Sequence, residues 1–212
     1  MTDDPREFHR PVRRPAEQFD RQFASSDPAE LSRVAHATAS ALLTRVRADP
    51  EAGVMERLIG FTGTHGIDTI AELWSRSPAR SLPGALWRLY LLQLMIHDDA
   101  DTAALLYEHG RAALRTADEA IAGAAVPAGP EELVALVDTI LRGVFSGDFA
   151  VALERAASFC RVEAAGATGL ADDYDATEPE RATTFTRRAL RLSTYADDLS
   201  ACATLWRREA LT

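Results

Sequence analysis

The sequence predicts an all-α fold, a single helical domain of about eight helices behind an N-terminal arm. Apolar residues recur at steps of three and four over most of the chain, which is the periodicity of amphipathic helices. Several of these runs open with an aspartate, serine or threonine close to a proline or glutamate, as helix N-termini do. Runs of alternating β-branched residues bounded by hairpin turns are missing, so no strand is predicted.

Composition limits the function classes. The chain has 212 residues, a net charge of −9 and 47% apolar residues, a balance typical of one globular domain with a sizeable core. The acidic charge disfavours nucleic acid as a partner, because phosphate binding needs a basic surface. No run reaches the ~20 apolar residues of a membrane span, so no membrane partner is expected. The sequence has no lysine, which excludes Schiff-base catalysis and a phosphate-loop lysine.

The two cysteines, Cys160 and Cys202, have no CxxC partner. They are predicted to be buried free thiols in a reducing cytoplasm, although a disulfide between their helices is an open alternative. The N-terminal residues lack the apolar segment of a signal peptide, which also favours a cytoplasmic location. The excess of alanine and arginine is typical of a high-GC genome.

Residues 1–26 are predicted to form a flexible arm, since three prolines interrupt any helix and apolar residues are sparse. The arm either frays or docks on a partner or a second subunit. Residues 27–212 then form the helical domain. Asp27 caps its first helix, and a shorter helix follows residue 50. A glycine-rich loop containing His65 leads to a helix over residues 67–76.

The run from residue 82 to residue 97 is predicted to be the buried central helix, because its apolar residues surround the helix almost completely. Ser81 caps its start, and Asp99 or Asp101 caps the following helix, which is expected to continue to Ile121. Gly110 within that helix predicts a close approach to another helix, since glycine otherwise costs about 1 kcal/mol relative to alanine there.

Three helices are predicted after the linker at residues 127–130. The first covers about residues 131–145. The second follows the N-cap Asp148 and ends near Ala165, because glycines then suggest a loop over residues 166–175. The third and longest begins at a capping box opened by Thr177 and covers residues 177–209.

The helix over residues 177–209 carries an apolar stripe with alternating four- and three-residue steps, the pattern of a helix that lies along another helix or along its own copy. The sequence therefore predicts either self-association through this helix or packing against the central helix of the same chain. The stripe comprises Phe185, Ala189, Leu192, Ala196, Leu199, Ala203 and Trp206.

Potential metal ligands occur in the order His65, then His97-Asp98, then a late aspartate, Asp197 or Asp172. This order resembles the HD-domain metal-dependent phosphohydrolases, which are all-helical. The resemblance implies a divalent metal that lowers the pKa of a bound water. The alternative is that His97 ends one helix and the following aspartates cap the next, as the helix dipole favours.

Two smaller clusters also have two interpretations. Asp197-Asp198 could join the acidic runs at residues 98–101 and 172–175 in a magnesium site of the kind found in helical diphosphate-processing enzymes. Solvated helix caps are the alternative. Arg187, Arg188 and Arg191 could contact a phosphate, or they could form a solvated face paired with Glu178 or Glu180.

Two function classes follow. The first is a non-enzymatic soluble helical protein without a cofactor that binds a protein partner or a small ligand and acts as an adaptor or regulator. The arm and the zipper-like last helix favour it. The second is the metal-dependent phosphohydrolase, using His65, His97, Asp98 and Asp197. The biological ligand or partner is not identifiable from these patterns.

Overall fold

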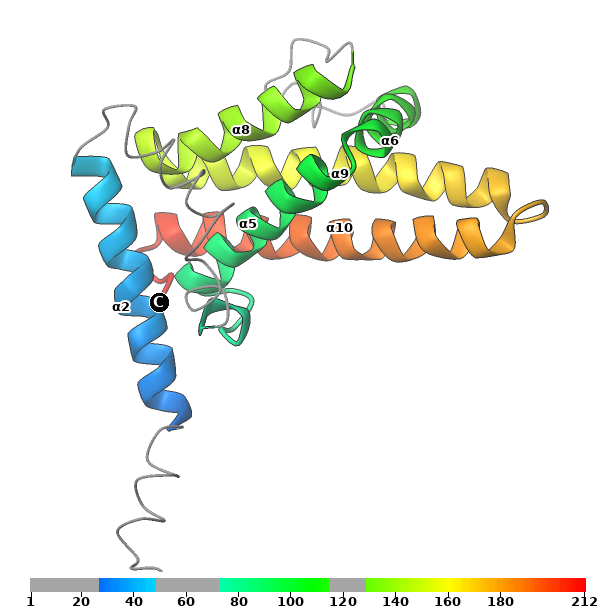
Figure 1. Ribbon diagram of the computed structural model, residues 1–212. Helices are drawn as coiled ribbons and strands as arrows, with labels where there is room; N and C mark the ends of the chain where they lie inside the picture. The colour runs from blue at the N-terminus through cyan, green and yellow to red at the C-terminus, as the bar shows by residue number, and fades with distance from the viewer. Residues whose placement is uncertain (1–26, 49–72, 115–128) are drawn as a thin grey trace, which may run out of the picture.

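The computed structural model describes residues 27–48, 73–114 and 129–212, and its helices confirm the all-α fold (Figure 1). No strand occurs in these three segments. The predicted arm, the helix after residue 50 and most of the helix over 67–76 lie outside them. The helices are α2 (Pro28–Ala48), α5 (Leu82–Asp98), α6 (Ala100–Ala113), α8 (Pro130–Ser146), α9 (Phe149–Tyr174) and α10 (Pro179–Arg207).

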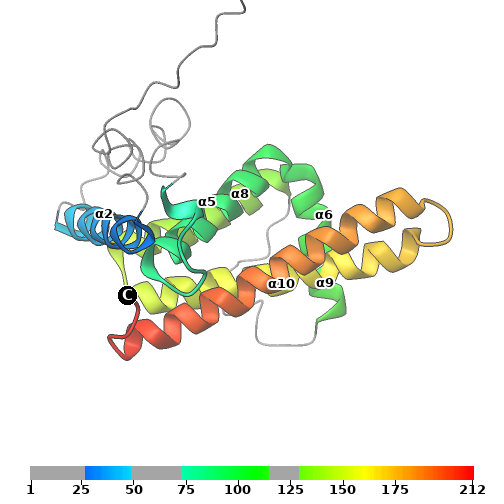
Figure 2. The same cartoon turned by 90° about the horizontal axis from the view of Figure 1, so that it is seen from below.

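Helix α9, rather than α5, lies at the centre of the described helices. It packs along α10 and also contacts α6 and α8, and both views show the antiparallel α9–α10 pair side by side (Figures 1 and 2). In α9, 16 of 26 residues are buried, against 8 of 17 in α5. Many of the buried α9 residues are alanines, and small side chains let neighbouring helices approach from several sides. The predicted role of 82–97 as the central helix is therefore not confirmed.

The apolar stripe of α10 packs within its own chain. Leu192 and Leu199 are fully buried in the core that α9 shares, and Trp206 is half-buried. The main partner of the stripe is α9, not the predicted central helix, because α9 runs beside α10 along its length. A dimer formed through this helix would consequently have to use its other face.

Helix α6 crosses α9 where two glycines face each other. A Cβ added at Gly110 would lie 2.8 Å from the carbonyl carbon of Val162, and one added at Gly166 would lie 2.7 Å from that of Leu106. These contacts confirm the close approach predicted at Gly110. Helix α9 continues to Tyr174, nine residues beyond its predicted end at Ala165, so the predicted loop over 166–175 was wrong. Gly166 lies inside this helix, where the lack of a side chain permits the close approach of α6.

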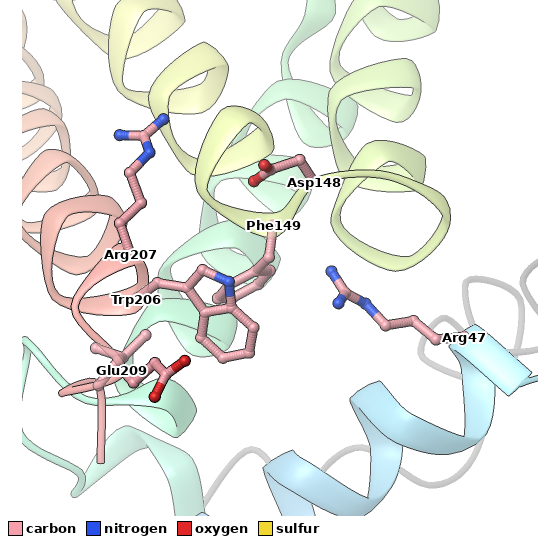
Figure 3. A pocket seen from close by; sticks show the side chains of 7 residues that line it. Arg47, Asp148, Phe149, Trp206, Arg207 and Glu209 are labelled. Carbon is pink, nitrogen blue, oxygen red and sulfur yellow. The ribbon is translucent and has the colours of Figure 1, made fainter.

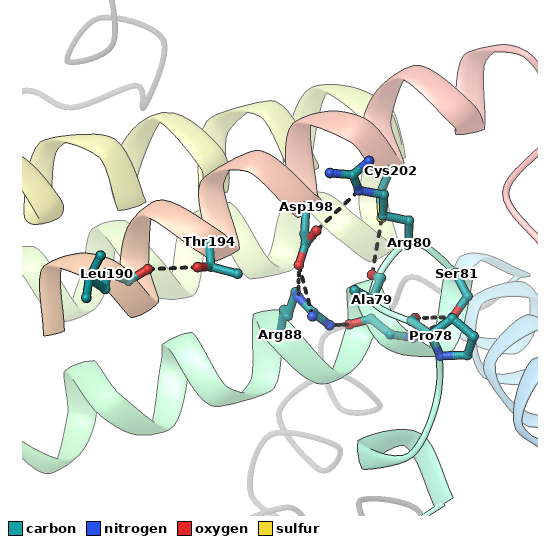
Figure 4. A network of polar contacts seen from close by, with 10 residues as sticks. Pro78, Ala79, Arg80, Ser81, Arg88, Leu190, Thr194, Asp198 and Cys202 are labelled. Carbon is teal, nitrogen blue, oxygen red and sulfur yellow. Dashed lines mark hydrogen bonds and ion pairs between the residues drawn. The ribbon is translucent and has the colours of Figure 1, made fainter. Parts of the chain in front are cut away.

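The carboxylate of Asp198 on α10 lies between Arg80, in the turn before α5, and Arg88 in α5 (Figure 4). Asp198 is 8% exposed, and it accepts hydrogen bonds from Arg88 Nε at 3.0 Å and Arg80 Nε at 3.3 Å. Arg88 Nη1 also donates to the Gly84 carbonyl. Asp198 of α10 is therefore linked both to Arg80 in the turn and to Arg88 in α5.

The helix ends agree with most of the predicted caps. Ser81, Asp99 and Asp148 each accept a hydrogen bond from the backbone N–H three residues later. Besides the end of α9, two boundaries differ. Helix α6 ends at Ala113, since Leu114 has an extended backbone, and α10 has Glu178 rather than Thr177 as its N-cap, without a side-chain hydrogen bond.

Within the three described segments, no helix combines the length and the hydropathy that a membrane span requires.

Candidate functional site

An open groove with a volume of about 560 Å³ lies at one end of the helices, where α2, α9 and α10 meet (Figure 3). Phe149 at the start of α9 and Trp206 at the end of α10 form its apolar wall, with their rings edge to face at 4.7 Å. Its lining residues are Arg47, Asp148, Phe149, Trp206, Arg207, Glu209 and Leu211.

Arg47 brings a cation to the indole of Trp206. Its Cζ lies 5.9 Å from the centre of that ring, within the range of a cation–π contact. Two carbonyls at the C-terminal end of α8 position the guanidinium, since Nη2 donates to Val144 O at 3.3 Å and Gly147 O at 3.0 Å. The helix dipole of α8 favours a cation at this end.

Nε and Nη1 of Arg47 have no hydrogen-bond partner among the described residues. The side chain itself is exposed. Arg47 therefore offers donor groups at the groove even though its position is fixed by α8.

The second arginine of the groove is already paired. Both terminal nitrogens of Arg207 donate to the carboxylate of Glu154 on α9, and this hydrogen bonding lowers the pKa of Glu154. In Figure 3 the Arg207 guanidinium points away from the indole of Trp206. Arg47 is therefore the cation directed at the groove.

The chain turns sharply after α10 to complete the groove. Glu209 has a φ of 54°, in the left-handed region, and Ala210 N donates to Leu205 O at 2.9 Å. This is the geometry of a left-handed helix cap, and it costs a non-glycine residue about 1 kcal/mol or more. The turn carries Leu211 back into the core, where it is 7% exposed.

The candidate metal ligands do not gather in the described residues. No three His, Cys, Asp or Glu side chains there form a cluster that could hold a metal ion. His97 Nε2 lies 3.0 Å from the carboxylate of Asp138 on α8, while Asp98 and Asp197 are exposed. His65 lies outside the described residues, so the four-residue site stays a prediction.

The other acidic residues considered as metal ligands lie apart from one another or serve as helix caps. Asp172 is exposed near the end of α9, whereas Asp198 pairs with arginines. Asp99 caps α6, as the helix-end interpretation predicts. The magnesium interpretation would require these groups to face one another, and the described residues contain no such cluster.

A buried carboxyl group of α9 lies next to an arginine of α10. Glu163 is fully buried, and its Oε2 lies 3.6 Å from Arg188 Nη2. Burial raises the pKa of Glu163 to about 8, although the charge of Arg188 acts in the opposite direction. For Arg188 the predicted partner was wrong, because it pairs with Glu163 and Asp99 rather than with Glu178 or Glu180, whereas Arg187 and Arg191 are exposed.

The sequence did contain a signal for Glu163. Ala156, Phe159 and Ala167 face the core at steps of three and four residues, and Glu163 occupies the position of this series between Phe159 and Ala167. The groove left no comparable signal, since Arg47 and Trp206 are 159 positions apart and neither stands in a motif.

Among the described residues that line it, the groove combines an aromatic wall, one available cation and two acids, Asp148 and Glu209. Such a surface can stack a flat ring and bind an anionic group, which is the chemistry of a ligand site. No protein-family model, curated protein or solved structure matches this chain.

Proposed function

We propose that this protein is a non-enzymatic helical binding protein, an adaptor or regulator, whose groove takes a planar aromatic acid. One observation carries the proposal. Trp206 and Arg47, which are far apart in the sequence, meet at the wall of the groove. Nε and Nη1 of Arg47 have no hydrogen-bond partner among the described residues, so both can donate to a ligand. A planar ring would stack on Trp206, while a carboxylate would accept hydrogen bonds from Arg47.

The expected affinity is modest. At a ligand efficiency of about 0.3 kcal/mol per non-hydrogen atom, the value typical of drug-sized ligands, the binding free energy of naphthoate would be about 4 kcal/mol. That free energy corresponds to a Kd near 1 mM. Naphthoate is therefore a probe for the chemistry of the groove rather than a candidate for its natural ligand.

The test is a titration of the protein with 1-naphthoate, followed through the indole N–H resonances of its three tryptophans in NMR spectra. We expect the Trp206 resonance to shift and that of Trp74, which is buried elsewhere, to stay unchanged. Arg47→Ala should weaken binding about fivefold, because a charge-assisted hydrogen bond contributes about 1 kcal/mol or more.

Two controls sharpen this test. Arg45→Ala removes an exposed arginine from the same turn of α2 and should leave binding unchanged. The neutral 1-naphthamide should bind the original protein more weakly than naphthoate does. Equal binding of both probes, or equal effects of the two arginine substitutions, would contradict anion recognition by Arg47.

Self-association through the helix over residues 177–209 is retained as a second part of the proposal, on its outer face. Leu190 is 64% exposed there, the largest value among the exposed large apolar side chains of the described residues. Sedimentation at micromolar concentration should show a dimer that Leu190→Glu separates, while Leu105→Glu on α6 leaves it intact. A monomer of the original protein would contradict this part.

A cytoplasmic location is also proposed. Cys160 and Cys202 are both buried and free, as expected for a protein of a reducing compartment. The metal-dependent alternative has a separate test, because stoichiometric manganese, iron or zinc that is lost on His97→Ala would favour the phosphohydrolase.

A further inference from the structure

Glu163 is an unusual group for the middle of a protein core. Its side chain is fully buried in α9, and neither carboxyl oxygen has a hydrogen-bond partner in the described structure. A buried carboxyl group without hydrogen bonds is costly, and the cost is far greater when it carries a charge. The group therefore favours its protonated form, and burial raises its pKa to about 8.

One guanidinium lies between this carboxyl group and a second one. Arg188 on α10 is 13% exposed, with Nη2 at 3.6 Å from Glu163 Oε2 and Nη1 at 3.5 Å from Asp99 Oδ2. Both distances exceed those of strong charge-assisted hydrogen bonds. Arg188 thus lies between two carboxyl groups and forms a short hydrogen bond with neither of them.

Asp99, which contacts Arg188, is also the N-cap of α6. Its Oδ1 accepts a hydrogen bond from the Thr102 N–H at 3.3 Å and so caps α6. The charged groups that act on Glu163 are therefore Arg188 from α10 and Asp99 from the start of α6. On its own helix the buried thiol of Cys160 lies one turn earlier, and Phe159 beside it stacks with Tyr107 of α6.

We propose that Glu163 is a proton-operated switch that sets, through Arg188, how firmly the start of α6 is held on the α9–α10 pair. When Glu163 carries its proton, it is neutral and Arg188 pairs with Asp99. When the proton leaves to solvent, the new negative charge in the core attracts the guanidinium. The contact between Arg188 and Asp99 then weakens, and the cap of α6 changes.

The experiment follows the backbone N–H resonance of Thr102 in the full chain by NMR from pH 6 to pH 9.5. We expect one titration step with its midpoint near 8, shared with the carboxyl carbon resonance of Glu163. Glu163→Gln should abolish the step at Thr102, since glutamine does not titrate. Asp99→Asn should also abolish it while leaving the titration of Glu163 in place.

Val151 supplies the matched control. Its N–H is capped by Asp148 Oδ1 at 3.1 Å, the same arrangement at the start of another helix. Its resonance should show no step near pH 8. A flat Thr102 resonance in the original protein would overturn the switch, and so would a step that survives Glu163→Gln. Different midpoints for Thr102 and Glu163 would also overturn it, and that comparison needs no variant.

Discussion

Gly166→Ala is expected to destabilise the protein by about 3 kcal/mol or more, measured as the free energy of unfolding in urea. The new Cβ would lie 2.7 Å from the carbonyl carbon of Leu106 and 2.9 Å from the N–H nitrogen of Gly110. Both atoms belong to the backbone of α6, which no side-chain rotation can move aside. Helices α6 and α9 would have to separate, and overpacking of this kind typically costs 1–3 kcal/mol, more against rigid backbone.

Gly169→Ala is the control for this prediction, one turn further along the same helix. A Cβ at Gly169 would meet no atom within 4 Å. Alanine is about 1 kcal/mol more favourable than glycine inside a helix, so this variant should be slightly more stable than the original. If both substitutions had the same sign, the crossing of α6 and α9 would not be as described.

The second large effect is the pH dependence of stability that Glu163 causes. Its pKa is raised to about 8 in the folded state, against 4.5 for a solvated glutamate. The folded chain therefore binds this proton more tightly than the unfolded chain between these values. Its contribution to stability is complete below pH 4.5 and is lost as the pH rises towards 8, with a slope of up to about 1.4 kcal/mol per pH unit.

Glu163→Gln isolates this contribution from that of all other groups. Glutamine carries no titrating proton, so the variant should gain stability relative to the original protein as the pH rises from 5 to 8. The gain should be on the order of a few kcal/mol by pH 8. The measurement is a series of urea unfolding curves at several pH values. Parallel stability profiles for the two proteins would show that Glu163 ionises as a solvated carboxyl group does.

The caps and the glycines show how far local sequence determines this fold. Ser81, Asp99 and Asp148 begin their helices as predicted, since an N-cap needs only a short polar side chain and the N–H groups that follow it. Gly110 was predicted to mark a helix crossing because glycine has a cost inside a helix. Gly166 was placed in a loop by the same property, because no local signal shows that α6 lies against it.

The sequence alone determined the all-α class, most helix starts and the buried stripe of α10, because each depends on residues within a few turns of one another. Tertiary structure decided that α9 is the central helix and that Glu163 shares Arg188 with Asp99. It also decided that Arg47 meets Trp206. Helical periodicity specifies which face of a helix is apolar, but it does not specify which other helix covers that face. Contacts between residues far apart in the chain therefore depend on how whole helices pack.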